Sequence, residues 1–238
     1  MLYWLFKWIV IGPWLRVLYR PWTEDMDVIP PQGPAILVSN HLSFCDSFFL
    51  ALVVDRRITF LAKQEYFTGK GIKGLISRAF FTGVGQVPID RSSGRAAEAA
   101  INTGLRVLSD GHLLGIYPEG TRTADGRLYR GKTGVARMAL ESRVPVIPVA
   151  MIGTYEIQPP GQVRPHIRRV GIRFGQPLDF SRYDGLEGDR FVLRSVTDEI
   201  MYALMGLSDQ EYVDVYAARA KQIRAEKAAV AAGEPDDD

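Results

Sequence analysis

Short apolar runs alternate with amphipathic stretches along most of this 238-residue chain. The short runs are typical of buried strands, and the stretches between them repeat their apolar positions with the period of a helix. This alternation predicts a single-domain α/β sandwich, in which helices flank a mixed, largely parallel sheet. Pro88 lacks a backbone donor, so its strand is expected at an edge or a strand end. The expected strands are residues 35–39, 58–62, 86–90, 113–117, 146–153 and 170–174, and the expected helices are residues 46–54, 71–81, 94–109, 133–142, 191–204 and 212–232.

The first 22 residues have a composition of their own, because they hold all four tryptophans of the chain, interleaved with basic residues such as Lys7. Indole rings prefer the headgroup zone of a bilayer, and long basic side chains can reach phosphates from there. Pro13 interrupts an apolar stretch that is far shorter than the roughly 20 residues of a spanning helix. We expect residues 1–28 to form an interfacial helical segment that holds the protein, peripheral or monotopic, on the cytoplasmic face of the cell membrane. The alternative is a helix packed on the domain as part of its core. The tryptophans are Trp4, Trp8, Trp14 and Trp22.

Composition limits the number of domains and the kinds of partner that the chain can have. With 47% hydrophobic residues, the chain can bury one sizeable core, which we assign to a catalytic domain over residues 29–210. Residues 211–238 are expected to form a C-terminal helix and an acidic tail. A net charge of +2 without a dense basic stripe argues against nucleic acid as a partner. One cysteine, Cys45, excludes a disulfide framework within the chain and fits a reducing compartment.

Chemistry-bearing residues follow three of the expected strands, where α/β sheets collect their ligands. His41 and Asp46 follow the first of these strands, and a histidine oriented by a carboxylate is the usual general base for activating a hydroxyl. Positions five apart on a helix lie about 140° apart. His41 must therefore lie in the turn before the helix, with Asp46 in its first turn. If Asp46 is consumed as a helix cap, the pair fails.

Cations at the neighbouring strand ends suggest an anionic group on the substrate. Arg122 follows Gly120 and Thr121, and a guanidinium, a hydroxyl and an open backbone together suit phosphate oxygens. Arg91 supplies a second guanidinium and Lys63 a possible third cation. For each cation alone, a surface salt bridge is the alternative.

Four blocks in order carry a resemblance to a known family: Asn40-His41-x4-Asp46, residues 85–91, Tyr-Pro-Glu-Gly-Thr-Arg at 117–122, and the Val-Pro-rich residues 144–149. The chain resembles the glycerolipid acyltransferases with the NHxxxxD motif, and among them the bacterial 1-acylglycerol-3-phosphate acyltransferases. The resemblance implies transfer of a fatty acyl chain from acyl-CoA or acyl carrier protein to the sn-2 hydroxyl of 1-acylglycerol-3-phosphate, giving phosphatidic acid. Pro88 departs from the pattern, since an aromatic residue is usual there.

The resemblance also implies roles for single residues. His41 would be the general base and Asp46 its orienting partner. Pro148 would line the acyl or thioester side. The implied partners are membrane lipids, a lysophospholipid acceptor and the acyl donor, with no further cofactor and no metal. The implied phosphate-binding residues are Arg91, Glu119, Gly120, Thr121 and Arg122, with Lys63 added from the strand-end pattern.

Other interpretations remain open. Cys45 near a histidine could suggest acyl-cysteine chemistry, but its apolar neighbours favour a small hydrophobe. Residues 126–133 match the P-loop pattern G-x4-G-K-[ST], but the required strand does not lead into Gly126, so a loop entering a helix is the preferred interpretation. Another lysophospholipid or glycolipid acceptor, or a non-catalytic membrane-binding module, are the alternatives for the whole protein.

Overall fold

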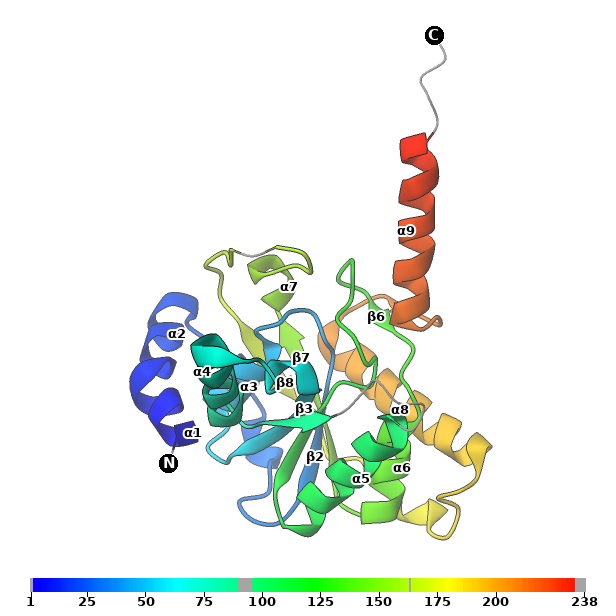
Figure 1. Ribbon diagram of the computed structural model, residues 1–238. Coiled ribbons are helices and arrows are strands. Elements are labelled where there is room, and N and C mark those ends of the chain that lie inside the picture. The colour runs from blue at the N-terminus through cyan, green and yellow to red at the C-terminus, as the bar shows by residue number, and fades with distance from the viewer. Residues whose placement is uncertain (1, 90–95, 163, 234–238) are drawn as a thin grey trace.

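The computed structural model describes residues 2–89, 96–162 and 164–233, and it confirms the α/β sandwich (Figure 1). Seven of the described strands form one sheet in the order β1-β8-β7-β2-β5-β3-β4, and two more, β6 and β9, form a small second sheet. The strands are β1 (Trp22–Glu24), β2 (Ala35–Ser39), β3 (Ile58–Lys63), β4 (Gln86–Ile89), β5 (Leu113–Ile116), β6 (Leu128–Tyr129), β7 (Val146–Ile152), β8 (Gly171–Phe174) and β9 (Tyr212–Val213).

The main sheet is mixed and largely parallel, as predicted. Strands β7, β2, β5, β3 and β4 run in one direction, whereas β8 is antiparallel to β7 and carries β1 beside it. Strand β4 is an edge strand, in which Pro88 pairs with Ala62. Because the central strands are parallel, their carboxyl ends share one edge of the sheet, and the loops that follow β2 and β5 meet there.

Alternating side chains of the central strand divide the core into two layers. Ile36 and Val38 of β2 pack into the layer formed with α5, α6 and α8, whereas Ala35 and Leu37 face the layer of α3. Figure 1 shows α5, α6 and α8 gathered on one side of the sheet and α1 to α4 on the other. The α-helices are α1 (Leu2–Leu5), α2 (Gly12–Tyr19), α3 (Asp46–Val53), α4 (Gly71–Gly83), α5 (Ala96–Ser109), α6 (Gly134–Ser142), α7 (Thr154–Ile157), α8 (Arg190–Ser208) and α9 (Ala217–Gly233), and the shorter or irregular turns are η1 (Phe6–Val10), η2 (Met26–Val28), η3 (Gln64–Tyr66) and η4 (Ser181–Tyr183).

The N-terminal segment packs on the domain and is also exposed. Tyr3 belongs to the core, whereas Trp14 is 68% exposed. The expectation that Lys7 reaches outward is wrong: its side chain is 6% exposed and its Nζ donates to the carbonyl of Val54. Trp22 was expected in the interfacial segment, but it begins β1 and its indole packs over Gly171. The sheet therefore starts inside residues 1–28. Among the described residues, no helix is long and apolar enough to cross a membrane.

The C-terminal region departs from the single helix expected over residues 212–232. Tyr212 and Val213 instead pair with Leu128 and Tyr129, because an aromatic and a β-branched residue suit a strand that meets a partner. Helix α9 begins at Ala217 and projects from the body of the protein (Figure 1). The remaining predicted elements occur where expected, with ends shifted by a few residues.

Candidate active site

His41 and Asp46 form a close pair beyond the carboxyl end of β2. Helix α3 begins at Asp46, and His41 lies in the non-helical segment before it, as the spacing required. The Nδ1 atom of His41 lies 2.9 Å from Oδ2 of Asp46. The His41 side chain is 20% exposed and that of Asp46 is fully buried, so the histidine faces outward and the carboxylate supports it from within.

The carboxylate of Asp46 serves the turn and the histidine at once. Its Oδ2 also accepts hydrogen bonds of 2.8 Å from the backbone N–H groups of Leu42 and Ser43. Asp46 is not consumed as a helix cap, because these donors lie in the turn before α3 and converge with the imidazole on one oxygen. The N-terminus of α3 adds a positive partial charge beside the carboxylate. Asp46 is therefore held in one position from several directions.

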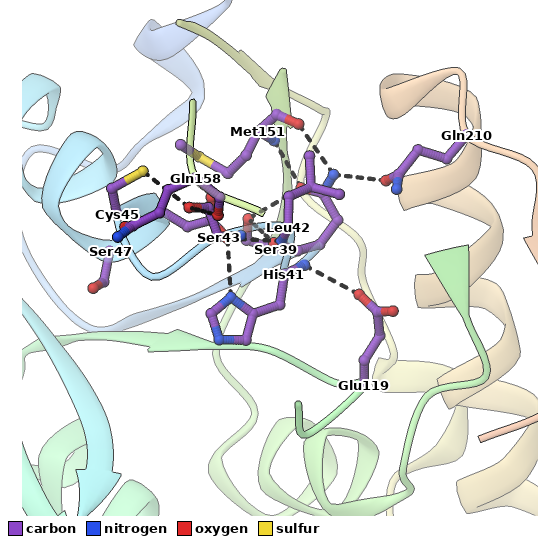
Figure 2. A network of polar contacts seen from close by, with 12 residues as sticks. Ser39, His41, Leu42, Ser43, Cys45, Ser47, Glu119, Met151, Gln158 and Gln210 are labelled. Carbon is purple, nitrogen blue, oxygen red and sulfur yellow. Dashed lines mark hydrogen bonds and ion pairs between the residues drawn. The ribbon is translucent and has the colours of Figure 1, made fainter. Parts of the chain in front are cut away.

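Two side chains from distant segments fix the backbone around His41 (Figure 2). Asn40 extends the β2–β7 pairing through its side chain, since its Oδ1 accepts from the N–H of Met151 at 2.7 Å and its Nδ2 donates to the same residue's carbonyl at 3.1 Å. Nδ2 also donates to Oε1 of Gln210 at 2.6 Å. Glu119 accepts the N–H of His41 at 3.1 Å. The backbone that carries the imidazole is thus bonded to the sheet, to the loop after β5 and to the residues after α8.

Glu119 does not contact a phosphate through its carboxylate in this arrangement. It is 1% exposed, and its second oxygen accepts the backbone N–H of Tyr129 at 3.0 Å. Burial raises the pKa of Glu119 to about 8, against the lowering effect of those two hydrogen bonds. Glu119 therefore ties the His41 turn to β6, and its expected part in phosphate binding stays a prediction.

Tyr117 is a site residue that the sequence did not single out for a role. Its ring stacks on the imidazole of His41 with centroids 3.9 Å apart and an interplanar angle of 13°. Burial, together with the charge of Asp46, raises the pKa of Tyr117 well above its usual value, so the phenol stays neutral. Its position directly after β5, ahead of the Pro-Glu-Gly-Thr-Arg run, was the available signal.

The loop after β5 carries Gly120, Thr121 and Arg122 next to the histidine. Gly120 has a φ of 73°, which favours glycine, and the loop is bonded to the His41 turn because the Thr123 N–H donates to the His41 carbonyl at 2.8 Å. Among the described residues, no carboxylate forms an ion pair with Arg122. The loop therefore carries a cation and a hydroxyl within a few residues of its bonds to the His41 turn.

Three further residues are expected at the site from the sequence, namely Pro148, Lys63 and Arg91. Pro148 is buried in the middle of β7, where it pairs with Val38, and its expected part in lining the acyl or thioester side stays a prediction. Lys63 ends β3 beside Ile89, and its side chain is outside what the structure describes. Arg91 lies outside the described residues.

The alternatives for this region are resolved by local structure. Residues 126–133 hold strand β6, and the N–H of Arg130 is bonded to strand β9 and Val215, so the backbone of this stretch does not form a P-loop. Burial raises the pKa of Cys45 to about 12, and its Sγ donates to Ser43 Oγ at 3.2 Å. A thiol in that state is protonated at neutral pH and behaves as a small hydrophobe.

The fold and the site together define an α/β protein in which a histidine on a buried carboxylate lies at the carboxyl edge of the parallel strands, beside the loop that carries Arg122. The family model described as Acyltransferase matches residues 22–152, more than half of the chain. The chain therefore belongs to the acyltransferase family. The matched range begins at β1, in agreement with the place of Trp22 in the sheet.

Individual relatives agree with this family. The 1-acyl-sn-glycerol-3-phosphate acyltransferase of Limnanthes alba is 31% identical over 146 residues, covering 61% of this chain and 50% of that protein. The enzyme of the same name from Bacillus subtilis (strain 168) is 28% identical over 127 residues, covering 52% of this chain and 59% of that protein. The chain thus spans about half the length of the curated relatives it matches. Among solved structures, the 1-acyl-sn-glycerophosphate (LPA) acyltransferase PlsC from Thermotoga maritima has a TM-score of 0.55 at 24% identity, covering 82% of this chain and 80% of that one, which shows the shared fold.

Proposed function

We propose that this protein transfers a fatty acyl chain from acyl-CoA or acyl carrier protein to the sn-2 hydroxyl of 1-acylglycerol-3-phosphate, with His41 as general base. The observation that carries the proposal is the 2.9 Å contact between His41 Nδ1 and the buried Asp46 carboxylate. It makes Nδ1 the protonated nitrogen, so Nε2 presents its lone pair outward. Among the described residues, no side chain or backbone group bonds Nε2.

The proposed reaction needs no covalent acyl-enzyme. Nε2 of His41 takes the proton of the acceptor hydroxyl while its oxygen attacks the thioester carbonyl carbon. The carbon–sulfur bond then breaks, and the imidazolium returns the proton to the leaving thiolate. Asp46 stabilises the imidazolium between these steps, as the acid of a catalytic triad does. The serine of such a triad is replaced by the lipid hydroxyl, and no further cofactor or metal takes part.

The proposed acceptor follows from the surroundings of His41 and from the relatives. Arg122 and Thr121 stand next to the histidine, where a phosphate attached to the acceptor would meet a cation and a hydroxyl. The relatives carry the name of 1-acyl-sn-glycerol-3-phosphate acyltransferases, which supports the same acceptor here. Another lysophospholipid remains the alternative within the same reaction class.

The N-terminal helices support work at a membrane surface. Trp8, Trp14 and Val17 are 47%, 68% and 69% exposed on the segment that also packs against α3 and α4. Exposed indoles and aliphatic side chains on one helical segment are typical of in-plane membrane binding. We place the protein peripherally on a membrane, on the cytoplasmic face that acyl-CoA and acyl carrier protein can reach.

The test is acyl transfer by the purified protein in mixed micelles that contain lysophosphatidic acid and a labelled acyl thioester. Wild-type protein is expected to release thiol in proportion to the acceptor and to form phosphatidic acid. The variant His41→Ala should lose about 10²- to 10⁴-fold in kcat while it keeps its fold. Thiol release that does not depend on the acceptor would indicate a thioesterase and refute the proposal.

A matched histidine variant controls for the loss of an imidazole as such. His112 is exposed and precedes β5 at the opposite edge of the sheet, so His112→Ala should retain full activity. A protein that binds vesicles but transfers no acyl chain to any lysolipid would favour the membrane-binding module instead.

A further inference from the structure

Helix α9 brings a cation to the loop beside His41, although it lies outside the range that the family model matches. Lys221 Nζ donates to Thr121 Oγ1 at 2.9 Å, across 100 positions of sequence. Its side chain is only partly exposed. A lysine that is drawn inward to a threonine hydroxyl, rather than extended into solvent, is held where a ligand of that loop would bind.

The same loop has a third cation. A Cβ placed on Gly120 would lie 3.0 Å from Nζ of Lys132, which shows how closely that ammonium approaches the loop backbone. Arg122, Lys132 and Lys221 thus come from three separate segments to one turn of four residues after Pro118. Among the described residues, none of the three forms a salt bridge with a carboxylate.

Glu119, in the same turn as Arg122, supplies little negative charge near neutral pH, because burial raises its pKa to about 8. Burial and the nearby Arg122 lower the pKa of Lys221, against a raising effect of Glu119, as expected for a cation held close to another. Such a cluster is stable when an anion occupies it.

We infer that Lys221 is a phosphate-binding residue for the acceptor, and that it acts together with Arg122 and Lys132. This inference rests on the proposed function and adds a residue from α9 to it. In a glycerol phosphate, the phosphorus lies about 5 Å from the sn-2 oxygen, since four ordinary bonds separate them. The loop that carries Arg122 is bonded to the His41 turn, so the phosphate of an acceptor whose hydroxyl lies on His41 is expected to meet this loop. A phosphate monoester bears nearly two negative charges at pH 7, which matches a cluster of several cations.

Helix α9 is attached to the turn in a way that fits this role. Arg224, one turn after Lys221, forms an ion pair with Asp125 at 3.2 Å, and Ala217 at the start of the helix is 1% exposed. These contacts hold the helix beside the loop independently of Lys221. Replacing Lys221 is thus expected to remove a ligand without releasing α9.

The experiment compares Lys221→Met with wild type in mixed micelles, using the acyl donor that wild type accepts. Loss of one charge-assisted contact to phosphate should raise the KM for lysophosphatidic acid by about tenfold or more. The kcat and the donor KM should stay unchanged. Inhibition by glycerol 3-phosphate, which has the phosphate and no acyl chain, should weaken by the same factor.

Two further variants make the result specific. Lys221→Arg keeps a cation and should restore most of the acceptor affinity, whereas Lys227→Met removes an exposed lysine from the same helix and should change nothing. An unchanged acceptor KM in Lys221→Met, or a rise in the donor KM alone, would overturn the inference. If wild type itself transfers no acyl chain, the proposed function fails. In that event, binding of glycerol 3-phosphate, measured by calorimetry for wild type and Lys221→Met, still tests the phosphate site.

Discussion

Asp46→Asn separates the charge of the dyad from its shape. An asparagine in the same position can place its amide oxygen where Oδ2 stands. The ring Nδ1–H of His41 and the backbone N–H groups of Leu42 and Ser43 then keep an acceptor. The amide NH₂ then occupies the place of Oδ1, which is buried and has no partner among the described residues. The geometry of the turn is preserved while the negative charge is lost.

The cost to stability follows from these three bonds. A hydrogen bond to a charged acceptor contributes about 1.5–3 kcal/mol, and one to a neutral acceptor about 0.5–1.5 kcal/mol. Three bonds, each weakened by about 1 kcal/mol, give a loss near 3 kcal/mol, which relief of the buried charge reduces. We expect Asp46→Asn to lower the free energy of unfolding by about 1–3 kcal/mol, measured by urea denaturation.

The cost to activity is expected to come from the charge of Asp46. Asp46 is fully buried, so under the proposed mechanism its charge acts through the imidazolium of His41. We expect kcat to fall by about 10²-fold or more, with the KM for lysophosphatidic acid unchanged, in the micelle assay of acyl transfer.

A matched variant and a clear refutation accompany this prediction. Asp110→Asn removes an exposed carboxylate just after α5, and it should leave both kcat and stability as they are. A folded Asp46→Asn protein with wild-type kcat would show that the carboxylate only shapes the turn, and the assignment of His41 as a base oriented by Asp46 would then be wrong.

Three further predictions concern the surface and two buried groups. The double variant Trp8→Ser and Trp14→Ser should weaken flotation with anionic vesicles by about tenfold or more. Phe191 on α8 is 68% exposed, as Trp14 is, and Phe191→Ser should leave flotation unchanged. An equal loss in both proteins would contradict a membrane role of the N-terminal segment. Burial raises the pKa of Glu119 from 4.5 to about 8, so between these values the native state binds more protons than the unfolded state. The free energy of unfolding should therefore fall as pH rises from 5 to 8, and Glu119→Gln should reduce this dependence in urea denaturation. The same pH dependence in both proteins would contradict a raised pKa of Glu119. Burial lowers the pKa of Lys7 from 10.5 to about 8, so above pH 8 the unfolded state binds more protons than the native state. The free energy of unfolding should therefore rise with pH there in wild type and not in Lys7→Met. The same rise in both proteins would contradict a lowered pKa of Lys7.

The layered fold was predictable because its longer strands have clear hydrophobic patterns in the sequence. The apolar run of β7 and the alternating faces of β2 lie inside the core, so burial and sequence pattern agree. Strands β6 and β9 have two residues each and β1 has three, which is too short to impose a period. Their existence depends on partners far away in sequence, as Leu128 with Tyr212 shows. For the same reason Trp22 was grouped with its aromatic neighbours instead of with the sheet.

The site was predictable only where its residues stand close together in the chain. His41 with Asp46, and Gly120 with Arg122, lie in short motifs whose residue types already suggest their chemistry. Lys221 reaches its place through a helix whose sequence shows only a charged, solvated pattern, and nothing local distinguishes it from Lys227. Contacts over such separations are a property of the folded chain.

The five-residue spacing of the dyad works because the fold holds every backbone group around His41. Its N–H is bonded to Glu119 and its carbonyl accepts from Thr123, while the next two N–H groups converge on Asp46. The side chain of Asn40 continues the sheet one residue beyond β2, so the turn begins from a fixed point. A helix would separate the two side chains by about 140°, and an unsupported loop would leave their distance undefined. The turn at His41 is neither helical nor unsupported, because it is bonded to the loop that also carries Arg122. The proposed base and the proposed anion site are therefore parts of one bonded unit, and a change that loosens the Glu119 contact should alter the geometry of both.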